Sequence, residues 1–332
     1  MLDLDDATFH HNDAPARVDA VERPPLEVLL AAPRGFCAGV RRAIEAVEAA
    51  LRVHGAPVYV RRAIVHNLTV VRDLEAMGAV FVQELDEVPE GAVTVLSAHG
   101  VSLGVLSQAK ARRLRTVDAV CPLVAKVHRE VVRHHRDGRR VVLIGHAGHP
   151  EIVGTLGQVP AGAALLIGDA AAVAGLPIEP GAPVAYAVQT TFSVDEASAI
   201  VAALQARFRD LAAPPASDIC YATSNRQAAL KAIAGEVEAV IVAGDASSSN
   251  ACRLAEVARG AGCPSVQLVA AAAQIDWRLI DGRARIGISA AASTPEKVVD
   301  GIVAALGRRF LVTVRAAEAV EENVSFKPLK VA

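Results

Sequence analysis

The chain has 332 residues, of which 52% are hydrophobic, 21% are charged and only 3% are aromatic, and its formal net charge at pH 7 is −2. This near-neutral balance excludes the strongly basic surface with which proteins bind nucleic acids or anionic membranes. No apolar run reaches the roughly 20 residues that a bilayer-spanning helix needs, so we expect no membrane association.

Residues 1–25 are acidic and contain histidine and proline, and they lack the apolar stretch of a secretory signal. We therefore expect a disordered N-terminal arm over 1–25 and a cytoplasmic protein. The remaining length suits two or three domains of ordinary size.

From residue 26 onward, runs rich in Val, Ile, Leu and Ala alternate with amphipathic stretches in which apolar residues recur every three or four positions. This alternation is typical of an α/β fold with parallel sheets. The predicted strands are 26–32, 93–97, 140–144, 184–188, 239–243 and 284–288, and the predicted helices are 38–51, 122–135 and 226–238.

Three cysteines occupy the same kind of place, since Cys37, Cys121 and Cys220 each precede a predicted helix. A polar loop follows each cysteine after 28 or 29 residues, and a second polar loop follows later in each third of the chain. We therefore predict three similar α/β domains. Their ranges are 39–120, 121–218 and 219–310, the third completed by strand 26–38, with a C-terminal tail at 311–332.

Ligands of parallel sheets bind at the carboxyl ends of the strands. Three such domains arranged around a centre would direct three cysteines and six polar loops at one place. The loops contain His66 and His99, His149 and Thr190, and Ser248 and Ser293.

The chain has five cysteines, an odd and widely spaced set that argues against a disulfide framework. Three thiolates at helix starts could hold a [4Fe–4S] cluster and leave one iron without a cysteine. Buried core thiols are the alternative. Cys252 also lies near a helix start, so its local setting does not exclude it, whereas we expect Cys263 to be structural.

The serine-rich loops at 247–250 and 289–294 combine hydroxyl groups with free backbone N–H groups, which can bind phosphate or merely cap a helix. Histidines in the other loops can bind phosphate or transfer protons. The pair His146 and His149 also suggests zinc, although no HExxH or CxxC pattern completes such a site. Glu151 is a candidate proton donor, or a first-turn glutamate that stabilises a helix.

At these residues the sequence resembles the IspH (LytB) family of 4-hydroxy-3-methylbut-2-enyl diphosphate reductases, over roughly residues 26–328. The motifs that carry the resemblance are PRGFCAGV (33–40), IVHN (64–67), SAHGVS (97–102), DAVCPLVAKVH (118–128), GHAGHPEIVGTLGQ (145–158), QTTFSVD (189–195), DICYATSNRQ (218–227) and SSNACRL (248–254).

The resemblance implies three similar α/β domains in a pseudo-threefold arrangement around a central [4Fe–4S] cluster. It implies that Cys37, Cys121 and Cys220 bind this cluster and leave one iron open. It implies Glu151, His149 and Thr190 as catalytic residues beside the substrate hydroxyl. The implied diphosphate-binding residues are His66, His99, His149, Ser248, Ser249, Asn250 and Ser293.

The implied reaction is a reductive dehydroxylation that yields isopentenyl and dimethylallyl diphosphate, the last step of the methylerythritol phosphate isoprenoid pathway. Reduced ferredoxin or flavodoxin would supply the electrons, since no GxGxxG or Walker motif for a nucleotide is present. The protein would be a monomer or a homodimer. The alternatives are a divergent paralogue, whose cluster senses redox state or serves another small diphosphate, and a metal-free α/β binding protein.

Some positions depart from the pattern of the family, among them Asp245 and Ala291 in the two serine-rich loops. A carboxylate at 245 should weaken diphosphate binding unless it points away from the anion or pairs with a cation. Alanine at 291 replaces a glycine and should restrict the approach of the backbone to phosphate.

Overall fold

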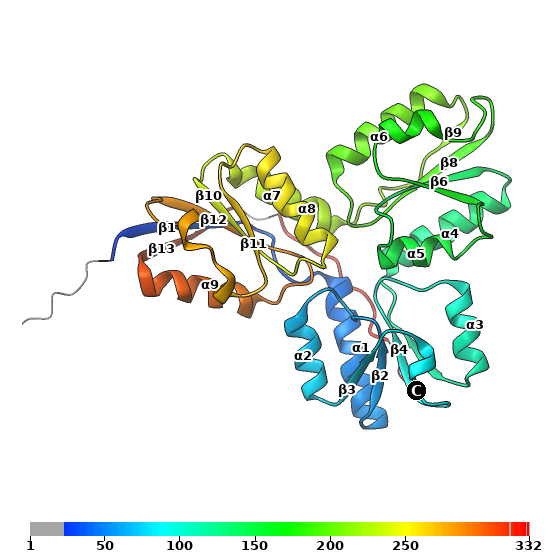
Figure 1. Cartoon of the computed structure of the whole chain (residues 1–332), viewed down its shortest axis with the longest axis horizontal. Helices are drawn as coiled ribbons and strands as arrows, with labels where there is room; N and C mark the ends of the chain where they lie inside the picture. Colours follow the sequence, from blue (N-terminus) through cyan, green and yellow to red (C-terminus); the bar gives the residue numbers. More distant parts are fainter. Residues whose placement is uncertain (1–22, 319, 330, 332) are drawn as a thin grey trace, which may run out of the picture.

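The structure is a computed structural model that describes residues 23–318, 320–329 and 331. The predicted arm at 1–25 lies almost wholly outside the described residues. Figure 1 shows three lobes that meet at the centre of the molecule. Each lobe contains one sheet, all of whose strand pairs are parallel, with a hydrophobic core on each of its two faces. The predicted α/β class with three parallel sheets is confirmed.

The first lobe has the strand order β3-β2-β4-β5. Its helix α1 is amphipathic, and it buries Ala43, Val47 and Ala50 against the sheet, as the three-and-four spacing predicts. The elements are α1 (Ala38–His54), β2 (Val58–Arg61), α2 (Leu68–Ala76), β3 (Ala79–Val82), β4 (Val93–Leu96), α3 (Leu103–Ala111) and β5 (Arg115–Asp118).

The second lobe has the order β7-β6-β8-β9. The predicted strands 140–144 and 184–188 coincide with β6 and β8, the two central strands of this sheet. The elements are α4 (Pro122–Arg136), β6 (Arg140–Ile144), α5 (Pro150–Leu156), β7 (Ala164–Ile167), β8 (Val184–Val188), α6 (Val194–Arg207) and β9 (Leu211–Ala212).

The third lobe has the order β11-β10-β12-β1-β13, so the first strand of the described chain lies between two of the last strands. Strand β10 is buried along its whole length, as expected for a strand covered on both faces. The elements are β1 (Pro25–Leu30), α7 (Tyr221–Ala234), β10 (Ala239–Ala243), α8 (Ser249–Gly260), β11 (Val266–Val269), β12 (Arg285–Ala290), α9 (Glu296–Arg309) and β13 (Leu311–Ala316).

Two predictions need correction. The predicted C-terminal tail (311–332) begins with a strand, because β13 pairs with β1 over six residues from Leu311 to Ala316. The helix predicted from its apolar period at 226–238 runs from Tyr221 to Ala234, so it begins directly after Cys220, where the cysteine pattern places a helix start. Its first turns are polar yet buried, as at Thr223 and Arg226, so they break the apolar period by which a buried helix is detected. The other domain limits remain a proposal.

Three of the passages between lobes end at a cysteine. The chain leaves β1 of the third lobe and enters α1 of the first lobe at Cys37. It leaves β5 and enters α4 of the second lobe at Cys121, and it leaves β9 and enters α7 of the third lobe at Cys220.

The C-terminal segment, defined as the described residues after β13, returns from the third lobe to the first lobe, where Leu329 packs against the core. On the way, Glu322 accepts a hydrogen bond of 2.9 Å from the guanidinium of Arg226. Only 1% of the Arg226 side chain is exposed, and the guanidinium also donates to the Gly35 carbonyl. The segment is therefore tied to α7 by a buried ion pair.

Replacing Glu322 by alanine leaves the Arg226 charge buried without its carboxylate, which should lower the free energy of unfolding by about 3 kcal/mol. Asp281→Ala is the control, because it removes the exposed pair with Arg309 and should cost less than about 1 kcal/mol. Urea unfolding of both variants measures the difference. Equal losses would show that Glu322 is not an anchor.

Candidate active site

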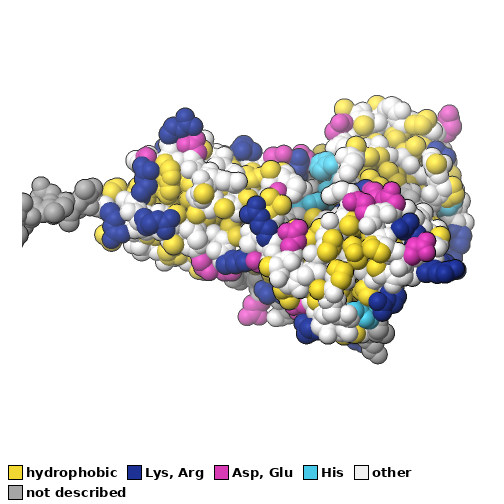
Figure 2. Space-filling model, turned by 60° about the horizontal axis from the view of Figure 1, so that its bottom comes forward, with side chains coloured by type: hydrophobic (Ala, Val, Ile, Leu, Met, Phe, Trp, Pro, Cys, Tyr) yellow, Lys and Arg dark blue, Asp and Glu magenta, His cyan; other side chains and the backbone are white. Residues whose placement is uncertain are grey.

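A cavity of about 110 Å³ lies where the three lobes meet. Histidine side chains are visible at this junction in the space-filling view (Figure 2). All twelve residues that the sequence singled out line this cavity: Cys37, His66, His99, Cys121, His149, Glu151, Thr190, Cys220, Ser248, Ser249, Asn250 and Ser293. The fold therefore brings together every predicted site residue, from all three lobes.

The three cysteines are the N-caps of α1, α4 and α7. The Cys37 sulfur accepts a hydrogen bond from the Val40 N–H, and the Cys220 sulfur accepts one from the Thr223 N–H. Three helix N-termini thus point their positive ends at one place, which favours thiolates and other anions there.

The sulfurs of Cys37 and Cys121 both lie beside Gly39. A Cβ atom built on Gly39 would lie 2.7 Å from the Cys121 sulfur and 3.8 Å from the Cys37 sulfur. Burial raises the pKa of Cys121 to about 12 and that of Cys220 to about 11, and the neighbouring thiols add to both shifts. As free thiols these groups therefore hold their protons, and only a bound cation would draw the protons off.

The remaining cysteines lie elsewhere. The Cys252 thiol donates to the Ala246 carbonyl, and Cys263 is buried in the core of the third lobe. Neither residue lines the cavity. Among the described residues, no three His, Cys, Asp or Glu side chains are grouped closely enough to hold a single metal ion.

His66, His99 and His149 form a triangle at one side of the cavity. Their ring centroids are 4.2 Å apart for His66 and His99, 5.6 Å for His66 and His149, and 5.9 Å for His99 and His149. Burial lowers the pKa of all three, to about 4 for His149 and well below the usual value for His99. The rings are therefore neutral at pH 7, and His149 Nδ1 accepts from the Glu151 N–H, which leaves Nε2 as the donor.

Hydroxyl and amide groups complete this side. Ser248 caps α8, and the Ser293 hydroxyl donates to the His66 carbonyl. Asn250 is 4% exposed, and neither its amide oxygen nor its amide nitrogen has a hydrogen-bond partner within the described part of the chain. A buried amide without a partner is costly, so it indicates a group that a ligand satisfies.

No lysine or arginine is found among the described residues that line the cavity. An anion bound there would be held by helix N-termini and neutral donors, in the manner of phosphate sites at helix starts. This arrangement suits an anion beside the three imidazoles.

Glu151 differs from these donors, because it is the one acidic side chain among the described residues that line the cavity. It is 2% exposed, and it accepts hydrogen bonds from the Thr190 N–H at 2.7 Å and from the Thr190 hydroxyl at 2.8 Å. Burial raises its pKa to about 7, against the lowering effect of the two hydrogen bonds. A glutamic acid with this pKa can release or take up a proton at neutral pH.

The departures from the family pattern do not face the cavity. The Asp245 carboxylate accepts hydrogen bonds from the Ser247 N–H and hydroxyl, and its charge raises the pKa of His66 against the larger effect of burial. Ala291 is fully buried in the core beside α8. Neither position lines the cavity, and only the charge of Asp245 reaches a residue that does, His66. His146 packs on the Phe192 ring instead of joining His149 at a metal.

Some lining residues were not predicted. Gly39 and Tyr221 also line the cavity. Both lie within two residues of a predicted cluster cysteine, Cys37 or Cys220, and this closeness in sequence could have indicated them. Phe326 also lines the cavity, but it comes from the C-terminal segment. No local pattern in the sequence points to Phe326.

Comparison with known proteins gives a consistent result. The family model described as LytB protein matches residues 28–307. A protein of Cereibacter sphaeroides named 4-hydroxy-3-methylbut-2-enyl diphosphate reductase is 54% identical over 304 residues, which cover 92% of this chain and 95% of the relative. A Paracoccus denitrificans protein of the same name is 54% identical over 92% of this chain and 97% of its own length.

Solved structures agree. The structure of the E-1-hydroxy-2-methyl-but-2-enyl-4-diphosphate reductase from Plasmodium falciparum matches with a TM-score of 0.86 at 34% identity, covering 92% of this chain and 96% of that one. A second structure, of (E)-4-hydroxy-3-methyl-but-2-enyl diphosphate reductase, described as the terminal enzyme of the non-mevalonate pathway, matches with a TM-score of 0.61 at 29% identity, covering 85% and 99%. In the described chain, no helix is both long and apolar enough to span a bilayer.

We expect the Glu151 carboxyl to titrate near pH 7, because burial disfavours its charged form. The folded protein binds this proton more tightly than the unfolded chain does. The resulting stability is therefore fully present below the ordinary glutamate pKa and is lost as the pH rises through about 7.

Infrared difference spectra of the wild type against Glu151→Gln measure this titration. Thr190→Val is the matched variant, since it removes the hydroxyl that donates to the carboxylate and should raise the pKa further. A Glu151 carboxylate already ionised at pH 5.5 would contradict the expectation.

Proposed function

Since this chain belongs to the LytB protein family, we propose that its cavity is the active site of a 4-hydroxy-3-methylbut-2-enyl diphosphate reductase, which removes the substrate's hydroxyl group reductively. The enzyme would yield isopentenyl and dimethylallyl diphosphate. One observation supports this most strongly. A single cavity of the described chain is lined by three cysteines, by a glutamate with a raised pKa and by neutral hydrogen-bond donors without a lysine or arginine.

We propose that Cys37, Cys121 and Cys220 hold a [4Fe–4S] cluster. The residues fit this group, because the three thiols line one cavity at three helix N-termini and Gly39 leaves room between two of them. When bound, such a cluster would supply electrons and a Lewis-acidic iron without a cysteine ligand.

The diphosphate would lie against the histidine triangle and the starts of α2 and α8. Asn250 would gain the hydrogen-bond partners that it lacks, and Nε2 of the histidines would donate to phosphate oxygens. Because an anion favours the charged imidazole, the pKa of these histidines should rise on binding. The binding residues would be His66, His99, His149, Ser248, Ser249, Asn250 and Ser293.

Glu151 would act as the general acid that protonates the departing hydroxyl oxygen, which leaves as water. The Thr190 hydroxyl donates to the Glu151 carboxyl at 2.8 Å, and it would lie beside the substrate's hydroxyl. His149 links the two functions, because its ring belongs to the histidine triangle and its Nδ1 accepts from the Glu151 backbone.

The main test is anaerobic turnover of the iron-loaded protein, with reduced methyl viologen as electron source and the hydroxylated diphosphate as substrate. Glu151→Gln keeps the shape but cannot give up a proton, so the turnover rate should fall by at least about a hundredfold. Glu179→Gln, at an exposed position, is the control. A wild type with an intact cluster and no turnover would rule out this function.

Gly39→Ala tests the cluster site separately. The added methyl group would lie 2.7 Å from the Cys121 sulfur, so that thiol has to move. We expect the variant to lose most of its iron and sulfide after anaerobic reconstitution. Gly301→Ala on α9, whose new methyl group meets no atom within 4 Å, should keep its iron. Full iron content in Gly39→Ala would remove Cys121 from the ligand set.

A further inference from the structure

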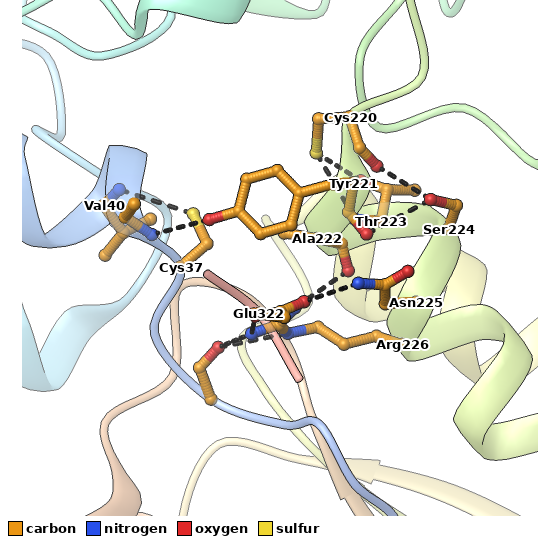
Figure 3. Close-up of polar contacts among 12 residues, drawn as sticks. Cys37, Val40, Cys220, Tyr221, Ala222, Thr223, Ser224, Asn225, Arg226 and Glu322 are labelled. Carbon is orange, nitrogen blue, oxygen red and sulfur yellow. Dashed lines mark hydrogen bonds and ion pairs between the residues drawn. The ribbon is translucent and has the colours of Figure 1, made fainter. Parts of the chain in front are cut away.

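The loop between β1 and α1 (residues 31–37), here called the Cys37 loop, is held on both sides of Cys37 by α7, the helix that Cys220 caps. The ring of Tyr221 and the guanidinium of Arg226 both extend from α7 toward this loop (Figure 3). Two side chains of one helix therefore connect two of the proposed cluster ligands.

Tyr221 contacts the chain just after Cys37. Its hydroxyl accepts a hydrogen bond of 3.0 Å from the N–H of Ala38, the first residue of α1. This N–H is one of the first amides of a helix, which have no partner within the helix. The Tyr221 side chain therefore joins the residue after Cys37 to the residue after Cys220.

Arg226 contacts the Cys37 loop just before Cys37. Its Nε and Nη2 donate to the Gly35 carbonyl at 3.1 and 2.8 Å. Its Nη1 donates at 3.0 Å to the carbonyl of Ala222, which follows Cys220 by two residues. The guanidinium thus joins the same two segments a second time, through a rigid planar group.

The charge of Arg226 is offset by Glu322 of the C-terminal segment. Both carboxylate oxygens of Glu322 accept from the guanidinium, at 2.9 and 3.3 Å, and the Arg226 side chain is 1% exposed. With the bonds to the two carbonyls, every N–H of the guanidinium is used. Arg226 cannot move without leaving buried donors unpaired, so its hold on the Cys37 loop is firm.

The third cysteine is held differently. Cys121 caps α4 without a side-chain hydrogen bond, whereas the sulfurs of Cys37 and Cys220 each accept one from a backbone N–H. Cys37 and Cys220 are therefore the pair that contacts within the described chain already fix.

Building on the proposed [4Fe–4S] site, we propose that Tyr221 and Arg226 are positioning residues for the cluster. They fix Cys37 and Cys220 relative to each other before iron and sulfide enter, and they keep the two cysteines from separating afterwards. Their effect acts through the two cysteines. Side chains that orient metal ligands in this way change metal retention by about tenfold or more.

The test measures how fast the ferrous-iron chelator bathophenanthroline disulfonate bleaches the reconstituted cluster, without oxygen or substrate. Arg226→Lys keeps the charge but replaces the planar fork by one ammonium group, which cannot bind the three partners together. We expect bleaching about tenfold faster than in the wild type, and altered g-values in the EPR spectrum of the reduced cluster. Tyr221→Phe removes one hydrogen bond and should bleach about fivefold faster.

Arg207→Lys and Tyr59→Phe are the matched controls. Arg207 is a half-buried arginine that donates to three backbone carbonyls of the second lobe, and Tyr59 is half-buried on β2 of the first lobe. Neither residue lines the cavity. Arg207→Lys should also lower the stability of the iron-free protein, but both controls should keep the bleaching rate and the EPR spectrum of the wild type.

Equal bleaching rates in Arg226→Lys and Arg207→Lys would overturn the proposal, since any effect would then follow from a general loss of stability. If Arg226→Lys does not fold, Tyr221→Phe decides, and a rate equal to that of Tyr59→Phe overturns the proposal. A wild type that takes up no cluster would overturn the proposed cluster site itself. A wild type with a full cluster and unaffected variants would overturn the positioning role alone.

Discussion

The structure depends on the position of three thiols, each at the residue where the chain enters a new lobe and begins that lobe's first helix. Cys37, Cys121 and Cys220 each end a connection between lobes. The lobes therefore meet where these three helix N-termini converge, and all three cysteines line the cavity there. Hydrophobic packing within each of the three lobes thus fixes the relative positions of side chains that lie far apart in the sequence. A buried ion pair and the C-terminal segment then add a fourth connection between the third and first lobes.

The same convergence explains the electrostatics of the cavity. Burial favours the neutral forms of the Cys121 and Cys220 thiols and of the imidazoles, and it raises the pKa of Glu151 to about 7. No cationic side chain is found in the described lining. The groups that line the cavity are therefore ones whose protonation a charged ligand would change.

Much of this arrangement could be predicted from the sequence, and the limits have physical causes. Strands β6, β8 and β10 were placed at their observed bounds, since buried parallel strands are continuous apolar runs. The apolar period did not extend to the start of α7, because Thr223 there lines the cavity and Arg226 is paired with Glu322. Phe326 and β13 could not be found locally, because their partners lie in parts of the chain remote in sequence.

The place of β1 in the third sheet has a consequence for biosynthesis. A chain is made from its N-terminus, and the first and second lobes can fold as they emerge because all their strands are close in sequence. Strand β1 emerges before them but has to wait for β12 and β13, which are made last and flank it. The third lobe, and with it the final position of Cys220, is therefore completed only after β13 has been made. A chain released before β12 and β13 are made would therefore leave β1 without its partners and Cys220 without its final place beside the cavity.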